Sequence, residues 1–251
     1  MKILVTAGGI SESLDSVRSI TNHSSGRLGS LIADEFITRG FDLTYVCTEK
    51  AVHPKLKVSN IVKVRSSTHL LDTLRELIKE NDYSAFIHSM AVSDYSPSGL
   101  SSFNAITSKI IKTLETCETL NNSREIIKKA VLSAFDPLTG RKMSSEHSDI
   151  FLHLKSNPKV IECFKTLCPK AVLVGFKLLS DVPEDELVNV ATSLLIRNSC
   201  DYVLANDIQD IRDDIHKAIL IDKNGILQKV NTKQEIAVLI ANTVKERIAN
   251  Q

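Results

Sequence analysis

The sequence predicts an α/β fold built on a doubly wound, mostly parallel β-sheet. Short apolar runs such as residues 2–7 and 171–176 contain no polar alternation, which is typical of strands buried on both faces of a sheet. Between such runs, stretches such as residues 28–37 carry apolar side chains at helical spacing. Strands that alternate with helices in this way favour a parallel sheet with right-handed crossovers.

The first half of the chain carries start and stop signals for its helices. Ser24-Ser25-Gly26 is expected to open the first helix, and Gly40 to end it in a left-handed cap. Thr68 is expected to cap the second helix. Further strands are expected at residues 43–47, 61–64 and 83–90.

Similar signals order the second half. Proline suits the first turn of a helix, so a helix is expected to begin at Asn157-Pro158. Asn224-Gly225 is a strong turn signal and predicts a C-terminal hairpin. The other expected elements are strands at 150–154, 171–176, 202–205, 216–222 and 226–230, and helices at 184–197 and 232–248.

Residues 97–141 interrupt the alternation of strands and helices. Two helices are expected there, at about residues 103–116 and 124–135, separated by the polar segment Asn121-Asn122-Ser123. We interpret this stretch as a helical insertion or flap within a single domain that covers residues 1–251.

Composition and charge exclude several classes of protein. The chain has 251 residues and a net charge of +1, so no broad field favours nucleic acid or a membrane surface. Its five cysteines are scattered and lack a C-x-x-C pair, which argues against a disulfide framework or a zinc ribbon. No apolar stretch approaches the roughly 20 residues of a membrane helix. A cytoplasmic location is therefore expected.

Two candidate binding segments lie near the start of the chain. Gly8 and Gly9 follow the first strand and would let the backbone approach a ligand, although the spacing is not the G-x-G-x-x-G dinucleotide pattern and a tight turn is the alternative. The second segment runs from Asn22 to Gly29 and places hydroxyl groups and free N–H groups at a helix start, which suits an anion. An ordinary helix cap without a ligand is its alternative. Arg18 lies nearby in the sequence.

Three later side chains have plausible roles in the same chemistry. Asp94 follows a strand and would accept a ribose hydroxyl or help to hold Mg²⁺, unless it merely starts a turn. Lys142 would neutralise a phosphate. Phe176 would form one wall of a base site, or else belong to the core.

The order of these segments resembles one family. Residues 5–9, 12–18 and 22–29 resemble the opening of the phosphopantothenate–cysteine ligases, also called phosphopantothenoylcysteine synthetases. Residues 91–95, 142–145, 157–159, 174–176 and 205–207 resemble the later motifs of that family, in the same order. No decarboxylase half precedes them, so the stand-alone bacterial form is expected.

The resemblance implies a Rossmann-like fold, Mg²⁺, CTP as co-substrate, and a homodimer that shares its active site. It implies that 4′-phosphopantothenate is activated as an acyl-cytidylate and is then attacked by the amine of L-cysteine, giving 4′-phospho-N-pantothenoylcysteine for coenzyme A biosynthesis. It assigns catalytic roles to Asn22, Lys142 and Arg18. The nucleotide- and substrate-binding residues that it implies are Gly8, Gly9, Ser24, Ser25, Gly26, Ala91, Asp94, Asn157, Pro158, Phe176 and Asn206.

Some features leave alternatives open. Leu178-Leu179 stand where a glutamate often follows the Gly-Phe pair of this family, so ATP remains an alternative to CTP. An NAD(P)-dependent oxidoreductase on the same fold and a non-catalytic nucleotide-binding relative are the two other hypotheses.

Overall fold

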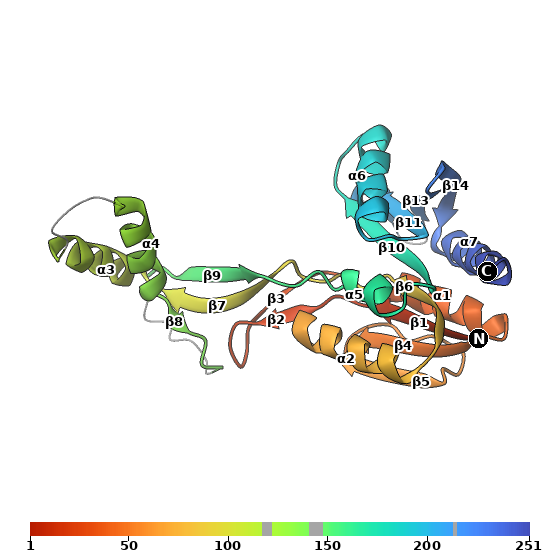
Figure 1. Cartoon of the computed structure of the whole chain (residues 1–251), viewed down its shortest axis with the longest axis horizontal. Helices are drawn as coiled ribbons and strands as arrows, with labels where there is room; N and C mark the ends of the chain where they lie inside the picture. The colour runs from red at the N-terminus through yellow and green to blue at the C-terminus, as the bar shows by residue number, and fades with distance from the viewer. Residues whose placement is uncertain (117–121, 141–147, 213–214) are drawn as a thin grey trace. The chain divides into compact units, whose positions relative to one another are not determined.

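The computed structural model describes residues 1–116, 122–140, 148–212 and 215–251 (Figure 1). These residues form two compact units. The first, here the sheet unit, comprises residues 1–10, 22–92 and 159–251. The second unit comprises residues 11–21 and 93–158. It includes the predicted insertion and also takes in a segment close to the N-terminus.

The sheet unit is built on a parallel sheet with antiparallel strands at one edge. The parallel strands lie in the order β5-β4-β1-β6-β10-β11, and β13 continues the sheet antiparallel to β11. Their bounds are β1 Lys2–Ala7, β4 Asp42–Thr48, β5 Asn60–Val64, β6 Tyr83–His88, β10 Val172–Leu179, β11 Tyr202–Asp207, β12 Ile211–Arg212, β13 Ile215–Asp222 and β14 Gly225–Thr232. The predicted fold class and the C-terminal hairpin of β13 and β14 are confirmed.

Helices cover both faces of this sheet and bury its apolar side chains. The helices are α1 Arg27–Thr38, α2 Ser67–Glu80, α5 Glu162–Leu167, α6 Glu184–Arg197 and α7 Lys233–Ala249, with a 3₁₀ turn at Ile208–Asp210. Buried residues of α1 and α7 share one core with strand residues such as Val5 and Leu204. Buried residues of α2, α5 and α6 share the other core, with Leu4 and Val203. Neighbouring strand residues thus enter opposite cores, as the two-residue period of a strand requires.

The strand order reverses its direction between β1 and β6. The strands that follow β1 in sequence build outward to β4 and β5, whereas β6 starts the other half of the sheet. Beyond the two strands, Ala91 N–H donates to the carbonyl of Gly8, and Ile10 N–H donates to the carbonyl of Ala91, both at 2.9 Å. In open α/β sheets, ligands bind outside the carboxyl ends of the strands at such a switch point.

Three helix starts differ from the sequence-based prediction. The cap of α2 is Ser66, not Thr68, because the Ser66 hydroxyl accepts the N–H of His69 at 3.2 Å. Helix α1 begins at Arg27 rather than at Ser24, after Gly26 in a left-handed conformation. The prediction that a helix begins at Asn157-Pro158 is wrong. That segment is not helical: the Asn157 N–H donates to the Asp94 carbonyl, and α5 begins at Glu162.

The second unit combines two small antiparallel sheets with two helices. Its elements are β2 Ser11–Ser13, β3 Ser19–Thr21, β7 Tyr95–Ser101, α3 Phe103–Glu115, α4 Ser123–Ser133, β8 Asp136–Pro137 and β9 Phe151–Ser156. Both helices expected in the insertion are present. The pairing of β7 with β9 extends the unit beyond residues 97–141, because β7 begins before the predicted insertion and β9 lies after it.

Within the ranges just given, no helix is both long enough and apolar enough to cross a bilayer.

Close packing of α1 on β1 requires a glycine. A Cβ at Gly29 would lie 2.6 Å from the Cβ of Ala7 and 2.7 Å from the Oγ of Ser89. We therefore expect Gly29→Ala to lower the free energy of unfolding by about 1–3 kcal/mol, since the extra methyl group overpacks the contact. Urea denaturation measures this. Thr38→Ala, at an exposed position of the same helix, should stay within about 0.5 kcal/mol of the parent; an equal loss in both variants would contradict the packing argument.

Candidate active site

The glycine pair after β1 allows two chain segments to cross. Gly8 has φ +97°, and a Cβ at Gly9 would lie 1.9 Å from the carbonyl oxygen of Asn22. The close approach seen here is between Gly9 and the backbone of Asn22, and the approach to a ligand stays a prediction. The glycines place residues 22–26 directly beside the end of β1.

Asn22 is held at this crossing by two hydrogen bonds. Its N–H donates to the carbonyl of Ile10 at 3.1 Å, and its Nδ2 donates to the carbonyl of Val92 at 3.1 Å. One bond fixes the backbone to the segment after β1, and the other fixes the carboxamide to the segment after β6. The side chain is therefore oriented before any ligand binds, as a group that contacts a reacting atom must be.

Helix α1 begins without a side-chain cap. Gly26, with φ +73°, occupies the cap position and has no side chain that could cap the helix. The N–H of Arg27 lies 3.3 Å from the Oγ of Ser25. The first N–H groups of a helix and its dipole together favour an anion. This helix start has the properties of a phosphate site.

A cavity of about 310 Å³ opens beside this helix start. We call it the rim pocket; it is lined by residues 23–29, by residues 89–91 after β6, and by side chains from the ends of β10 to β13 and the start of α7. Its volume falls at the lower end of the range of small-molecule sites. The predicted site residues that line it are Ser24, Ser25, Gly26, Ala91, Phe176 and Asn206.

The far wall of the rim pocket contains His216, which the sequence analysis did not select. This side chain is only 6% exposed. Within the described ranges, neither of its ring nitrogens has a hydrogen-bond partner. Burial, aided by the charge of Lys233, lowers the pKa of His216 to about 4. Alternation along the predicted strand 216–222 was the signal available, because it places His216 on the same face as the buried Ala218 and Leu220.

The other predicted site residues lie in the second unit. The N–H of Asn157 donates to the carbonyl of Asp94 at 2.8 Å, and its Nδ2 donates to the carbonyl of Ser93 at 3.0 Å. The structure thus brings Asp94 and Asn157 together, with the exposed Pro158 following at once. The buried Glu12 approaches the same carboxamide, with its Oε1 3.4 Å from Nδ2.

Arg18 lies at the end of the turn between β2 and β3. The Asp15 Oδ1 accepts the N–H groups of Val17 and Arg18, both at 2.7 Å, and closes this turn. The Arg18 Nε lies 3.4 Å from the other oxygen of the Asp15 carboxylate. The guanidinium group is therefore anchored at one side and partly exposed to solvent. Lys142 lies outside the described residues, so its predicted role stays a prediction.

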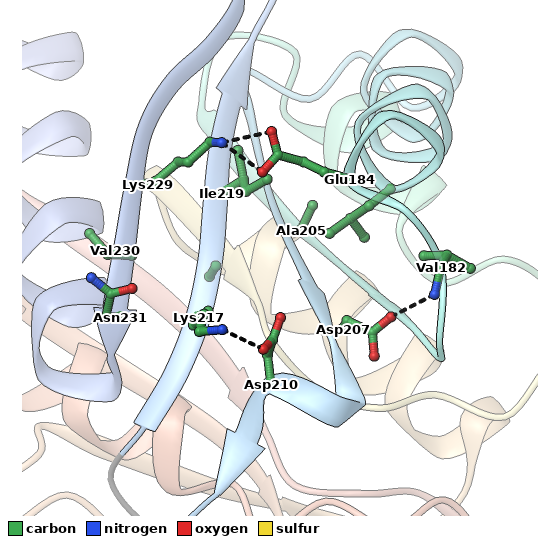
Figure 2. Close-up of a pocket in the computed structure, with 12 residues that line it drawn as sticks. Val182, Glu184, Ala205, Asp207, Asp210, Lys217, Ile219, Lys229, Val230 and Asn231 are labelled. Carbon is green, nitrogen blue, oxygen red and sulfur yellow. Dashed lines mark hydrogen bonds and ion pairs between the residues drawn. The ribbon is translucent and has the colours of Figure 1, made fainter.

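A second, smaller cavity of about 170 Å³ lies between α6 and the edge strands of the sheet unit (Figure 2). Its charged groups already have partners. Lys229 pairs with Glu184 at 2.6 Å, and Lys217 pairs with Asp210 at 2.8 Å. The Asp207 carboxylate accepts backbone N–H groups, which lower its pKa. Because these groups already have partners, they can offer a ligand fewer hydrogen bonds and charges than the residues of the rim pocket can.

Among the described residues, no group of three or more His, Cys, Asp or Glu side chains is placed to hold a metal ion. Mg²⁺ in nucleotide-dependent enzymes usually needs only one or two carboxylates, because phosphate oxygens and water complete its coordination. A preformed cluster is therefore not required for the cation that the resemblance implies.

Two buried histidines make stability depend on pH. The His88 Nδ1 lies 2.8 Å from the Thr6 hydroxyl oxygen, and burial lowers the pKa of His88 to about 4, as for His216. In the unfolded chain, histidine has a pKa of about 6.5, so below that pH the unfolded state binds more protons than the folded state. The free energy of unfolding should therefore fall as the pH drops from about 6.5 to 5.

Each histidine should contribute up to about 1.4 kcal/mol per pH unit in this window. Urea denaturation at several pH values measures the slope, and His216→Phe should remove about half of it. A parent protein whose stability is constant or rises over that interval would show that these rings are not neutral in the folded state.

Comparison with known proteins identifies a family. The family described as DNA/pantothenate metabolism flavoprotein C-terminal domain matches residues 1–134 and 113–248. The coenzyme A biosynthesis bifunctional protein CoaBC of Methanocaldococcus jannaschii is 28% identical over 98% of this chain, and that of Thermococcus kodakarensis is 26% identical over 98%. In both cases the match covers 51% of the relative, so the chain spans about half the length of these curated relatives.

Solved structures agree with this result. The DNA/pantothenate metabolism flavoprotein from Streptococcus pneumoniae is 37% identical, with a TM-score of 0.80 over 98% of this chain and 99% of its own. The Cab2 mutant H337A in complex with phosphopantothenate-cysteine has a TM-score of 0.70 over 99% of this chain and 86% of its own; at 18% identity it shows a shared fold. The resemblance found in the sequence is confirmed at the level of the family. The chain belongs to the family of the DNA/pantothenate metabolism flavoprotein C-terminal domain.

Proposed function

We propose that this chain joins 4′-phosphopantothenate to L-cysteine, with a nucleoside triphosphate as the source of energy. The observation that carries the proposal is the rim pocket, which combines an uncapped helix start with an apolar wall at the switch point of the sheet. The family supports it, since curated relatives are coenzyme A biosynthesis proteins. A structural neighbour was solved with phosphopantothenate-cysteine bound.

The proposed reaction has two steps. A carboxylate is a poor electrophile, so its oxygen first attacks the α-phosphorus of CTP or ATP, forming an acyl-nucleotidylate and releasing pyrophosphate. The amine of cysteine then attacks the acyl carbon, and the nucleoside monophosphate leaves with the former carboxylate oxygen. Both steps need fixed N–H donors and cations near the phosphates, because negative charge shifts onto phosphate oxygens as they proceed.

The rim pocket supplies these groups at one end. The first N–H groups of α1 point out of the helix start, where an anion would bind. Arg27 and Lys233 both line the cavity. Mg²⁺ would arrive on the triphosphate and neutralise part of its charge. At the other end, Phe176 and Leu178 offer apolar surface to the base. The cavity therefore has one cationic end that suits the phosphates and one apolar end that suits the base.

In this proposal Asn22 acts on the acyl group. Its bonds to the segments after β1 and β6 orient the carboxamide beside the helix start, where the α-phosphate would lie. In this proposal Arg18, Asp94, Asn157 and Pro158 bind phosphopantothenate and Lys142 binds phosphate, as the family resemblance implies.

A homodimer is part of the same proposal. Helix α3 has no buried residue, although apolar side chains such as Phe103 and Ile111 are each 56% exposed. Large exposed apolar residues on one helix are typical of an interface. A second copy of the chain is the partner that the family resemblance implies.

The direct test is a product assay. Purified protein is incubated with 4′-phosphopantothenate, cysteine, Mg²⁺ and either CTP or ATP, and we expect 4′-phospho-N-pantothenoylcysteine, pyrophosphate and nucleoside monophosphate in equal amounts. Asn22→Asp should lower product formation by about 100-fold, since it removes the Nδ2 donor and places a carboxylate beside the Val92 carbonyl.

Asn189→Asp is the matched control, because Asn189 is exposed on α6 and does not line the rim pocket. Full activity in Asn22→Asp would remove the assignment of Asn22. Nucleotide binding without any product would favour a non-catalytic relative. Tight binding of NADPH, with no effect of CTP or ATP on thermal stability, would favour an oxidoreductase.

A further inference from the structure

His216 is an anomaly in the core of the sheet unit. The residue is 6% exposed, and both of its ring nitrogens are buried without a hydrogen-bond partner among the described residues. A buried polar group that forms no hydrogen bond destabilises the folded state, so such groups are rare in native proteins. The other buried histidine of this unit, His88, shows the usual arrangement, since its Nδ1 lies 2.8 Å from the Thr6 hydroxyl oxygen. An unsatisfied group that lines a cavity is best explained by a ligand that satisfies it.

The sheet register places His216 beside Asn206. The antiparallel ladder of β11 and β13 ends with the pair Ala205 and Ile219, and its register, carried one residue further, sets Asn206 opposite Ala218. His216 lies two residues from Ala218 and on the same face. It is thus the diagonal neighbour of Asn206, a position within reach of a shared ligand. Leu178 pairs with Asn206 on the other side.

His216, Asn206 and Leu178 line the rim pocket, on the sheet face that α1 and α7 cover. Phe176 lies on the same strand and the same face as Leu178. The pocket therefore has an apolar surface from β10 next to two polar side chains from β11 and β13. The uncapped start of α1 forms a different part of its lining.

The two polar side chains share one kind of chemistry. A neutral imidazole offers one donor and one acceptor, and a carboxamide offers both as well. Burial and the nearby Lys233 keep His216 neutral, since its pKa is lowered to about 4. Phosphate oxygens only accept hydrogen bonds, whereas the edge of a nucleobase presents donors and acceptors side by side. The pair matches the base better than it matches the phosphates.

Building on the proposed function, we propose that His216 and Asn206 hydrogen-bond the polar edge of the nucleobase, and that His216 takes part in the choice between CTP and ATP. The base lies against Phe176 and Leu178, with its edge toward the two polar side chains. The triphosphate extends to the start of α1. His216 is thus a binding and specificity-determining residue, and the reacting atoms lie at the other end of the nucleotide.

The test compares nucleotides with a ligand that has no base. Titration calorimetry on the full chain with Mg²⁺ measures the Kd of CTP, ATP and inorganic tripolyphosphate for the parent, His216→Phe and His216→Gln. His216→Phe should weaken the preferred nucleotide about tenfold, the size of one lost hydrogen bond, and change the ratio of the two nucleotide affinities. Binding of tripolyphosphate should stay within about twofold. His216→Gln, which keeps a donor and an acceptor, should restore part of the affinity.

Thermal stability distinguishes this role from a structural one. Without ligand, His216→Phe should melt at the same temperature as the parent or higher, because it removes an unsatisfied polar group. The contrasting variant His88→Phe should melt lower, since it leaves the Thr6 hydroxyl without its histidine partner.

The results that would contradict this inference differ from those that would contradict the proposed function. Unchanged nucleotide affinities in a folded His216→Phe would overturn the inference and leave the ligase proposal standing. An equal loss for tripolyphosphate would overturn it as well, because the ring would then contact phosphate. A parent protein that binds neither nucleotide would contradict both proposals at once.

Discussion

The organisation of the site depends on the contact between the segments that follow β1 and β6. Ala91 donates to the carbonyl of Gly8 and accepts from Ile10, so these segments stay paired beyond the strands themselves. Asn22 then bonds to both, through Ile10 and Val92. This pairing sits where the strand order reverses, and it fixes the start of α1 at the carboxyl edge of the sheet. The pocket, the helix start and Asn22 all take their positions from it.

Glycines make this arrangement possible, although fixing their flexible backbone on folding costs conformational entropy. A side chain at Gly9 would collide with the Asn22 carbonyl, and one at Gly29 with Ala7. Such collisions involve backbone or buried atoms, which cannot move aside without disturbing the core. The same segment therefore serves two purposes, close packing of α1 on β1 and exposure of the first helical amides to a ligand.

The fold and several residues that line the rim pocket were predictable from the sequence, because their signals are local. Apolar runs gave the strands, and Gly40 and Asn224-Gly225 marked a helix end and a hairpin through their backbone preferences. The start of α5 was not predictable in this way, because Asn157 bonds to Asp94, which is distant in the sequence. His216 was missed because a lone histidine in a strand is informative only once its neighbours across the sheet are known. The two small sheets of the second unit depend likewise on long-range pairing.

The central claim is that a nucleotide occupies the rim pocket with its phosphates at the start of α1 and its base against the β10 wall. A crystal structure of the chain soaked with CTP and 4′-phosphopantothenate tests this most directly. We expect phosphate density within hydrogen-bond distance of the amides of residues 27–29 and base density beside Phe176. Well-ordered nucleotide in the smaller cavity beside α6, with none in the rim pocket, would contradict it.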